Sequence, residues 1–145
     1  MRIVIDANRI VAALIKQSTT REIILDGLFE FVTPDFVLYE IKKHRNELQK
    51  KTKLTEKEFN VLLILIFEQI IILPKSSYLK FIDDCKNYVI DINDVPYLAA
   101  CIASKATGIW SHDPHILKQK KVRVFTNINM LDLSKSARAN GHKKN

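Results

Sequence analysis

Two aspartates in this chain follow apolar runs that have the pattern of buried strands. Asp6 comes directly after Ile3-Val4-Ile5, and Asp113 comes shortly after Gly108-Ile109-Trp110-Ser111. In open α/β proteins, ligands bind in the crevice outside the carboxyl ends of parallel strands. If both runs are strands of one parallel sheet, the two carboxylates lie at the same edge despite their distance along the chain.

Two further acids stand at places that converge on that edge. Glu40 belongs to a predicted helix after the second strand, and Asp94 begins a helix in which Pro96 is tolerated in the first turn. Each acid alone has a simpler explanation. Asp91 or Asn93 is then a helix N-cap, Asp94 a favourable first-turn charge and Glu40 a solvated side chain. Together, the four acids favour one shared site.

A cluster of carboxylates at a strand edge supplies a particular chemistry. Such groups repel one another unless a hard cation neutralises them, and ligation by oxygen alone suits Mg²⁺ or Mn²⁺. A bound ion lowers the pKa of a coordinated water and offsets charge on a phosphate, and two ions about 3.5–4 Å apart clamp the attacking and leaving oxygens. The acids therefore predict phosphate chemistry, with the number of ions left open.

Alternating strands and helices are needed to position these acids. Apolar runs separated by stretches with helical spacing predict βαβ units, and hence a parallel sheet covered on both faces. The predicted strands are 3–5, 29–32, 70–73, 109–111 and 122–125. The predicted helices are 8–14, 19–28, 36–48, 56–67, 78–86 and 93–105, with Asn8, Asp35 and a Thr55–Glu58 capping box at three of their starts.

Length and composition fit a single domain. The 145 residues are 47% hydrophobic and 27% charged, and a formal charge of +7 favours a polyanionic partner such as nucleic acid. The two cysteines lack disulfide or metal-binding spacing, and the N-terminus lacks a signal-peptide pattern. The apolar stretch 61–73 is too short for a membrane span of about 20 residues. We expect a soluble, cytoplasmic protein in which residues 134–145 form a basic, disordered tail.

Four blocks of the chain, taken in order, resemble those of the PIN domain family. They are Val4-Ile5-Asp6-Ala7-Asn8, Tyr39-Glu40-Ile41, Asp91-x-x-Asp94-x-Pro96-x-Leu98-Ala99 and Trp110-Ser111-His112-Asp113. The resemblance implies one PIN-like nuclease domain over residues 1–133, built as a three-layer α/β/α sandwich with a central parallel sheet of four to five strands. Many short prokaryotic proteins of this kind are VapC-type toxins that cleave RNA.

Carried over to this sequence, the resemblance implies an acidic quartet of Asp6, Glu40, Asp94 and Asp113 that binds Mg²⁺ or Mn²⁺. Asp6 and Asp94 are the expected core ligands, and Asp113 adds a direct or water-mediated contact. Glu40 holds a second ion or orients the attacking water. Hydrolysis of this type leaves a 5′-phosphate and a 3′-hydroxyl.

Polar and basic neighbours complete the expected site. Asn8, Asp91 and Ser111 match supporting positions. The expected RNA-binding residues, which alternatively form only a solvated face, are Arg9, Lys42, Lys43 and Arg45. His112 and His115 flank the last acid, but without a third His or a Cys nearby we expect them at the surface or on the substrate side rather than on zinc.

The resulting hypothesis is an endoribonuclease that acts on RNA, either as the toxin of a toxin–antitoxin pair with a small antitoxin protein as partner or alone. A homodimer is common among such proteins. Three alternatives compete with it. A phosphatase of the haloacid-dehalogenase type needs a second Asp two residues after the first, where this chain has Asn8. A non-catalytic PIN-like module would bind RNA or protein, and a pure interaction protein would use its acids only as helix caps. The RNA target, the preference for RNA over DNA and the oligomeric state stay open.

Overall fold

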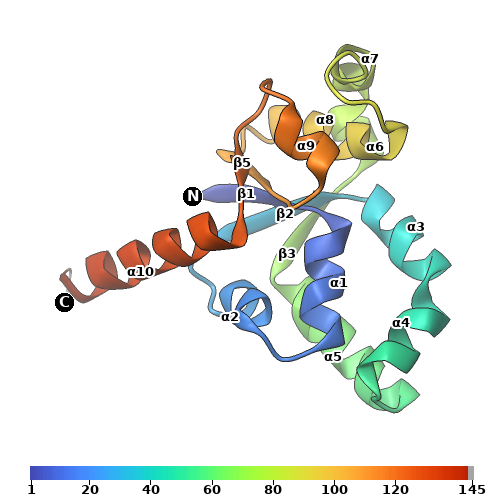
Figure 1. The fold of residues 1–145 in the computed structure, drawn as a ribbon, viewed down its shortest axis with the longest axis vertical. Coiled ribbons are helices and arrows are strands. Elements are labelled where there is room, and N and C mark those ends of the chain that lie inside the picture. The colour runs from blue at the N-terminus through green and yellow to red at the C-terminus, as the bar shows by residue number, and fades with distance from the viewer. Residues whose placement is uncertain (144–145) are drawn as a thin grey trace.

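Five parallel strands form the centre of the computed structural model, which describes residues 1–143 (Figure 1). They are β1 (Arg2–Ile5), β2 (Glu30–Pro34), β3 (Ile70–Leu73), β4 (Gly108–Trp110) and β5 (Val124–Phe125), in the order β3-β2-β1-β4-β5. β1 is central, and Ile5 pairs with Trp110 of β4. The carboxyl ends of β1 and β4 therefore lie side by side, as predicted.

Alternating side chains of the strands build two cores, one on each face of the sheet. Ile3 and Ile5 pack on one face, against α1 (Ala7–Ile15), α2 (Thr19–Leu25), α3 (Phe36–Lys43), α4 (Arg45–Thr52), α5 (Glu56–Glu68) and α10 (Asn127–Lys143). Val4 packs on the other face, against α6 (Lys75–Tyr78), α7 (Ile82–Cys85), α8 (Val95–Ala103) and α9 (Pro114–Lys118). The three-layer α/β/α sandwich with a parallel sheet is thus confirmed.

Several predicted helices are interrupted. The helix expected over 36–48 is split into α3 and α4, because the His44 N–H donates to Ile41 O and closes α3 with a tight turn. The segment expected as a helix over 78–86 consists of α6, the short 3₁₀ turn η1 (Leu79–Phe81) and α7. The helix expected over 93–105 begins as the 3₁₀ turn η2 (Ile92–Asp94) and continues as α8.

Two of the three predicted helix caps are wrong. The cap of α1 is Asp6 rather than Asn8, since Asp6 Oδ1 accepts the Arg9 N–H at 2.9 Å. Asp35 makes no capping bond to α3, because its carboxylate accepts the Lys75 N–H and the Tyr78 hydroxyl from α6 instead. The capping box of Thr55 and Glu58 at the start of α5 is confirmed.

The expectation of a disordered tail over 134–145 is wrong for the residues that the structure describes. Residues up to Lys143 belong to α10, and the last two residues lie outside the described chain. Met130 is fully buried in the core and Ser134 is 1% exposed, so the first half of α10 is packed against the domain. Arg138 pairs with Asp26 just after α2, which extends the docking of the helix.

The two cysteines and the apolar stretch 61–73 lie in helices and strands of the domain. Cys85 and Cys101 are buried free thiols in α7 and α8. The apolar stretch 61–73 is divided between the second half of α5 and strand β3. Within residues 1–143, no helix combines the length and apolar character needed to cross a membrane.

Candidate active site

The end of β1 places Asp6 at the carboxyl edge of the sheet. Asp6 is only 4% exposed, and its carboxylate caps α1 by accepting the Arg9 N–H. Ser111, fully buried just after the neighbouring strand β4, makes a hydrogen bond to the Asp6 carboxylate. The Ser111 hydroxyl also accepts the Asp113 N–H at 3.0 Å. Ser111 therefore supports the first and the last acid at once, as the sequence suggests.

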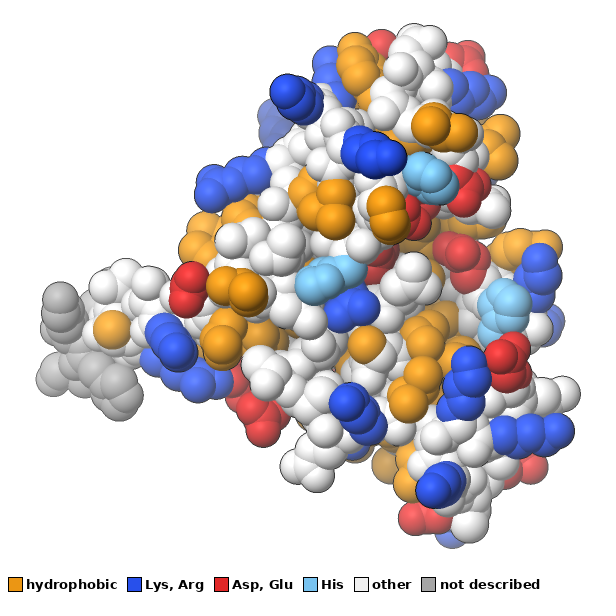
Figure 2. Space-filling model, viewed as in Figure 1, with side chains coloured by type: hydrophobic (Ala, Val, Ile, Leu, Met, Phe, Trp, Pro, Cys, Tyr) orange, Lys and Arg blue, Asp and Glu red, His pale blue; other side chains and the backbone are white. Residues whose placement is uncertain are grey.

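Helices on the two faces of the sheet bring Glu40 and Asp94 to the same edge. Glu40 comes from α3, and Asp94 ends η2 directly before α8. A small hollow joins them to the end of β1; it is lined by Asp6, Ala7, Asn8, Glu40, Asn93, Asp94, Tyr97 and Ile116. Figure 2 shows acidic side chains recessed near the middle of this face, with histidines beside them. The structure thus brings Asp6, Glu40 and Asp94 together around one hollow.

Asp94 has the most unfavourable position for a negative charge. Burial, followed by the charges of Asp113, Asp91, Asp6 and Glu40, raises its pKa from 3.8 to about 7. Asp94 Oδ2 is buried and has no hydrogen-bond partner within the described residues. A buried carboxylate oxygen without a donor is costly unless something else neutralises it. The negative charge on Asp94 is therefore relieved either by a bound proton or by a cation.

The pKa values of Asp6 and Glu40 are also raised by their surroundings. Burial raises the pKa of Asp6 to about 6, although hydrogen bonds from Ser111 and the Arg9 N–H and the charge of Arg9 oppose this. Burial also raises the pKa of Glu40, against a hydrogen bond from Tyr97. The Tyr97 hydroxyl donates to Glu40 Oε1 at 2.5 Å. Tyr97 thus fixes one oxygen of Glu40, a contact that the sequence did not indicate.

The donor set fits a hard divalent cation. The groups that crowd Asp94 are all carboxylates, and oxygen ligands of this type suit Mg²⁺ or Mn²⁺. The unpartnered Oδ2 of Asp94 supplies a ligand atom that no other group in the described chain uses. Of the predicted quartet, Asp94 belongs to a group of potential ligand atoms within 4.8 Å of one another in the described residues, and its companions there are Asp91 and His115, so the quartet as a metal site stays a prediction.

Asp91 and His115 lie close to Asp94 and are further potential metal ligands. One ligand atom from each of Asp91, Asp94 and His115 lies within 4.8 Å of the others. Asp91 also caps η2, since its Oδ1 accepts the Asn93 N–H at 2.9 Å. His115 was expected only at the surface or on the substrate side. The position of His115 depends on the turn at Asp113. The Asp113 carboxylate caps α9 by accepting the His115 N–H, and this turn places His115 beside the acids.

The start of α10 is tied to the same edge through Asn127. Its Oδ1 accepts Trp110 Nε1–H at 2.9 Å and an Nη1–H of Arg9 at 3.3 Å. Its backbone N–H donates to His112 Nε2 at 2.8 Å. Asn127 therefore connects the end of β4 and His112 beyond it to the first turn of α1 and to the last helix. Nothing in the sequence around Asn127 marks it as part of the site, because its partners come from distant segments.

The predicted RNA-binding residues do not all face the acids. Arg9 lies beside Asp6, and the charge of Lys43 lowers the pKa of Glu40. Lys42 is exposed near the end of α3. Arg45 turns away, because its guanidinium bonds Asn60 and lies over the Phe59 ring of α5. Arg45 is therefore placed to hold α4 against α5, not to meet a substrate at the acids.

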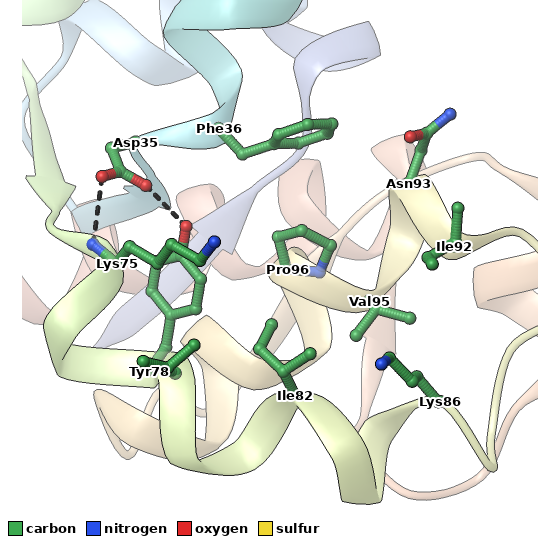
Figure 3. Close-up of a pocket in the computed structure, with 11 residues that line it drawn as sticks. Asp35, Phe36, Lys75, Tyr78, Ile82, Lys86, Ile92, Asn93, Val95 and Pro96 are labelled. Atoms are coloured by element: carbon green, nitrogen blue, oxygen red, sulfur yellow. Dashed lines mark hydrogen bonds between the residues drawn. The ribbon is translucent and has the colours of Figure 1, made fainter.

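A large cavity adjoins the acidic hollow, and Asn93 lines both. Its volume is about 620 Å³. Figure 3 shows that the side chains around it come from α3, α6, α7, η2 and α8; they are mainly apolar, with Lys75 and Lys86 among them. The Phe36 ring packs edge-on against Tyr97, the residue that bonds Glu40. The cavity and the acidic hollow are thus neighbours that share Asn93 as a lining residue.

Comparison with known proteins agrees with this arrangement. A family model described as PIN domain matches residues 4–129, which include all four acids of the quartet. No curated protein matches the chain. PIN domains are generally nucleases and usually use divalent metal ions. Since the match covers most of its length, the chain belongs to the PIN domain family.

Proposed function

We propose that this protein is an endoribonuclease that hydrolyses RNA phosphodiester bonds with the help of Mg²⁺ or Mn²⁺. The observation that carries the proposal is the buried Oδ2 of Asp94, which has no donor within residues 1–143 and is surrounded by other acids. Acids that served only as helix caps would not need to crowd one another in this way. Asp6 does cap α1, but capping uses only its Oδ1.

The four acids have different roles in the proposed hydrolysis. When bound, a divalent ion offsets charge on the phosphate and lowers the pKa of a water. Asp6 and Asp94 hold the ion, and Asp113 adds to the same negative edge. Glu40 has one oxygen fixed by Tyr97, which leaves its second oxygen to accept the proton of the attacking water. The new bond joins the water oxygen to phosphorus, and the 3′ oxygen leaves.

The large cavity beside the acids supports an unpaired RNA strand as the substrate. Sequence-specific RNA recognition targets single-stranded segments whose bases enter pockets and stack on aromatic side chains. Phe36 offers a ring, and Lys75 and Lys86 offer positive charge near the backbone of such a strand. The formal charge of +7 supports a polyanionic substrate in general.

A narrower form of the proposal makes the protein the toxin of a toxin–antitoxin pair. In that case a short reading frame beside the gene encodes a small protein that binds this chain and silences it. Expression of the wild-type chain should then arrest growth, expression of Asp94→Asn should not, and co-expression of the neighbouring frame should restore growth. Growth that is unaffected by the wild-type chain would rule out the toxin role and leave the nuclease proposal intact.

One cleavage experiment tests the nuclease proposal. Labelled single-stranded and hairpin RNA are incubated with the protein in Mn²⁺, Mg²⁺ or EDTA, alongside Asp6→Asn and Asp94→Asn. We expect cleavage of the single strand with either ion and none with EDTA or with either variant. Asp132→Asn, which removes an exposed acid of α10, is the matched control and should cleave normally. Binding without cleavage would identify a non-catalytic RNA-binding module, and cleavage that survives both site variants would refute the proposal.

A further inference from the structure

His115 stands next to the acids at distances that a hydrogen bond does not explain. Its Nδ1 lies 3.6 Å from Asp113 Oδ1 and 3.9 Å from Asp94 Oδ2. Both separations exceed the range of a good N–H···O bond, which is about 2.7–3.2 Å. Asp94 Oδ2 is also the buried oxygen that lacks a hydrogen-bond partner within the described residues. The ring nitrogen and the unpartnered oxygen therefore lie within ion-pair distance but make no hydrogen bond.

These separations lie within the span that two ligands of one metal ion can have. With bonds of about 2.1 Å, neighbouring ligands of an octahedral ion are about 3 Å apart and opposite ligands about 4.2 Å apart. The two distances from His115 Nδ1 fall between these limits. The wider group of Asp91, Asp94 and His115, with ligand atoms within 4.8 Å, needs only a small contraction to close on an ion.

The burial of the group indicates which member is fixed and which can adjust. Asp94 is 7% exposed and is held between η2 and α8. His115 is on the first turn of the short helix α9, and its side chain is 43% exposed. The imidazole can thus move toward the ion while Asp94 stays in place. Asp113, which caps α9, sets the position of the histidine through its bond to the His115 N–H.

We propose that His115 Nδ1 is a direct ligand of the metal ion held by Asp94, and that this nitrogen makes the site selective for Mn²⁺ over Mg²⁺. The inference rests on the proposed metal-dependent function and adds a non-carboxylate ligand to it. Imidazole nitrogen suits transition-metal ions, whereas Mg²⁺ prefers oxygen ligands and keeps its waters. A quartet of carboxylates alone would discriminate less between the two ions.

Binding of Mn²⁺ to the protein without RNA tests the proposal directly. Pulsed electron paramagnetic resonance of bound Mn²⁺ should show coupling to an imidazole nitrogen in the wild-type protein and lose it in His115→Gln. His44→Gln is the matched control, because His44 is an exposed histidine at the end of α3. Calorimetry should find that His115→Gln weakens Mn²⁺ binding by about tenfold or more, the scale seen when groups around a metal site are removed. Mg²⁺ binding should change by less than about threefold.

Each outcome bears on one of the two claims. Stoichiometric Mn²⁺ binding without nitrogen coupling would overturn the role of His115 while the carboxylate site stands. Coupling that persists in His115→Gln would assign the nitrogen to another residue and overturn the proposal equally. Failure of Mn²⁺ to bind at millimolar concentration would overturn the proposed function as well. The thermal unfolding of His115→Gln in EDTA should match that of the wild type, which separates a lost ligand from a lost fold.

Discussion

Asp94→Asn should make the metal-free protein more stable, although Asp94 lies in a well-packed region. The pKa of about 7 for this group, against an ordinary value of 3.8, corresponds to about 4 kcal/mol of destabilisation when the group is ionised, at 1.36 kcal/mol per pKa unit. That value is an upper bound, because the neighbouring acids share the same repulsion. We expect a gain of about 1–3 kcal/mol at pH 8. The amide also supplies donors in a place that lacks them.

The pH dependence follows from the sign of this shift. A carboxyl with a raised pKa binds its proton more tightly in the folded state, so its contribution to stability is fully present below pH 3.8 and is lost as pH rises through about 7. Wild-type protein in EDTA should therefore lose stability between pH 5 and pH 8 relative to Asp94→Asn. The two should become nearly equal only below about pH 3.8, where the wild-type group is protonated in both the folded and the unfolded protein, and the difference at pH 5 should be smaller than at pH 8.

Urea unfolding in EDTA at pH 5 and pH 8 measures both effects, with equal denaturant slopes as the check on two-state behaviour. Asp132→Asn on the exposed face of α10 is the control and should change stability by less than about 0.5 kcal/mol. Mn²⁺ at one thousand times Kd should reverse the order, because only the wild type gains the free energy of binding, about 4.1 kcal/mol at that concentration. A variant that is less stable than the wild type at pH 8 in EDTA would refute the argument that unneutralised charge crowds Asp94.

Three further predictions concern the support of the site and the fold. Tyr97→Phe removes the donor to Glu40 Oε1 and should lower kcat about tenfold with little change in KM, measured by steady-state RNA cleavage; an unchanged kcat would contradict the role of Glu40. Gly108→Ala places a methyl group 2.5 Å from the Arg123 carbonyl oxygen. Urea unfolding should therefore show that the free energy of unfolding falls by at least about 2 kcal/mol. A smaller loss would mean that β4 and β5 separate easily. Met130→Ala opens a cavity under α10 and should cost about 2–5 kcal/mol by the same method; a neutral result would mean that α10 is not docked in solution.

The sheet and the acidic edge could be predicted because their signals are local. Ile3, Val4 and Ile5 form an apolar run that ends on Asp6, and the parallel pairing of β1 with β4 then fixes the side where Asp113 must lie. The alternation of strand and helix patterns leaves few other arrangements. For the same reason, the fold class was predictable without any knowledge of individual contacts.

Features that depend on distant partners were not predictable. Asp35 looks like a helix cap from its neighbours, but its carboxylate meets α6 some forty residues later in the chain. The tail was expected to be disordered because Lys135 and Arg138 lie in a polar stretch, whereas Met130 and the pairing of Arg138 with Asp26 dock it as a helix. His115 lies beside Asp94 only because the turn at Asp113 folds it back, a geometry that residue type alone does not specify.

The contacts of Asn127 bear on when the protein acquires its finished shape during synthesis. This residue follows all four acids in the chain, yet it bonds Arg9 beside the first acid and His112 beside the last. A ribosome therefore makes Asp6, Glu40, Asp94 and Asp113 before it makes the residue that fastens their surroundings. The nascent chain carries an edge whose last bonds are missing until the beginning of α10 has left the exit tunnel. Such an order would keep the proposed ribonuclease immature while it is still next to the messenger and ribosomal RNA that direct its own synthesis.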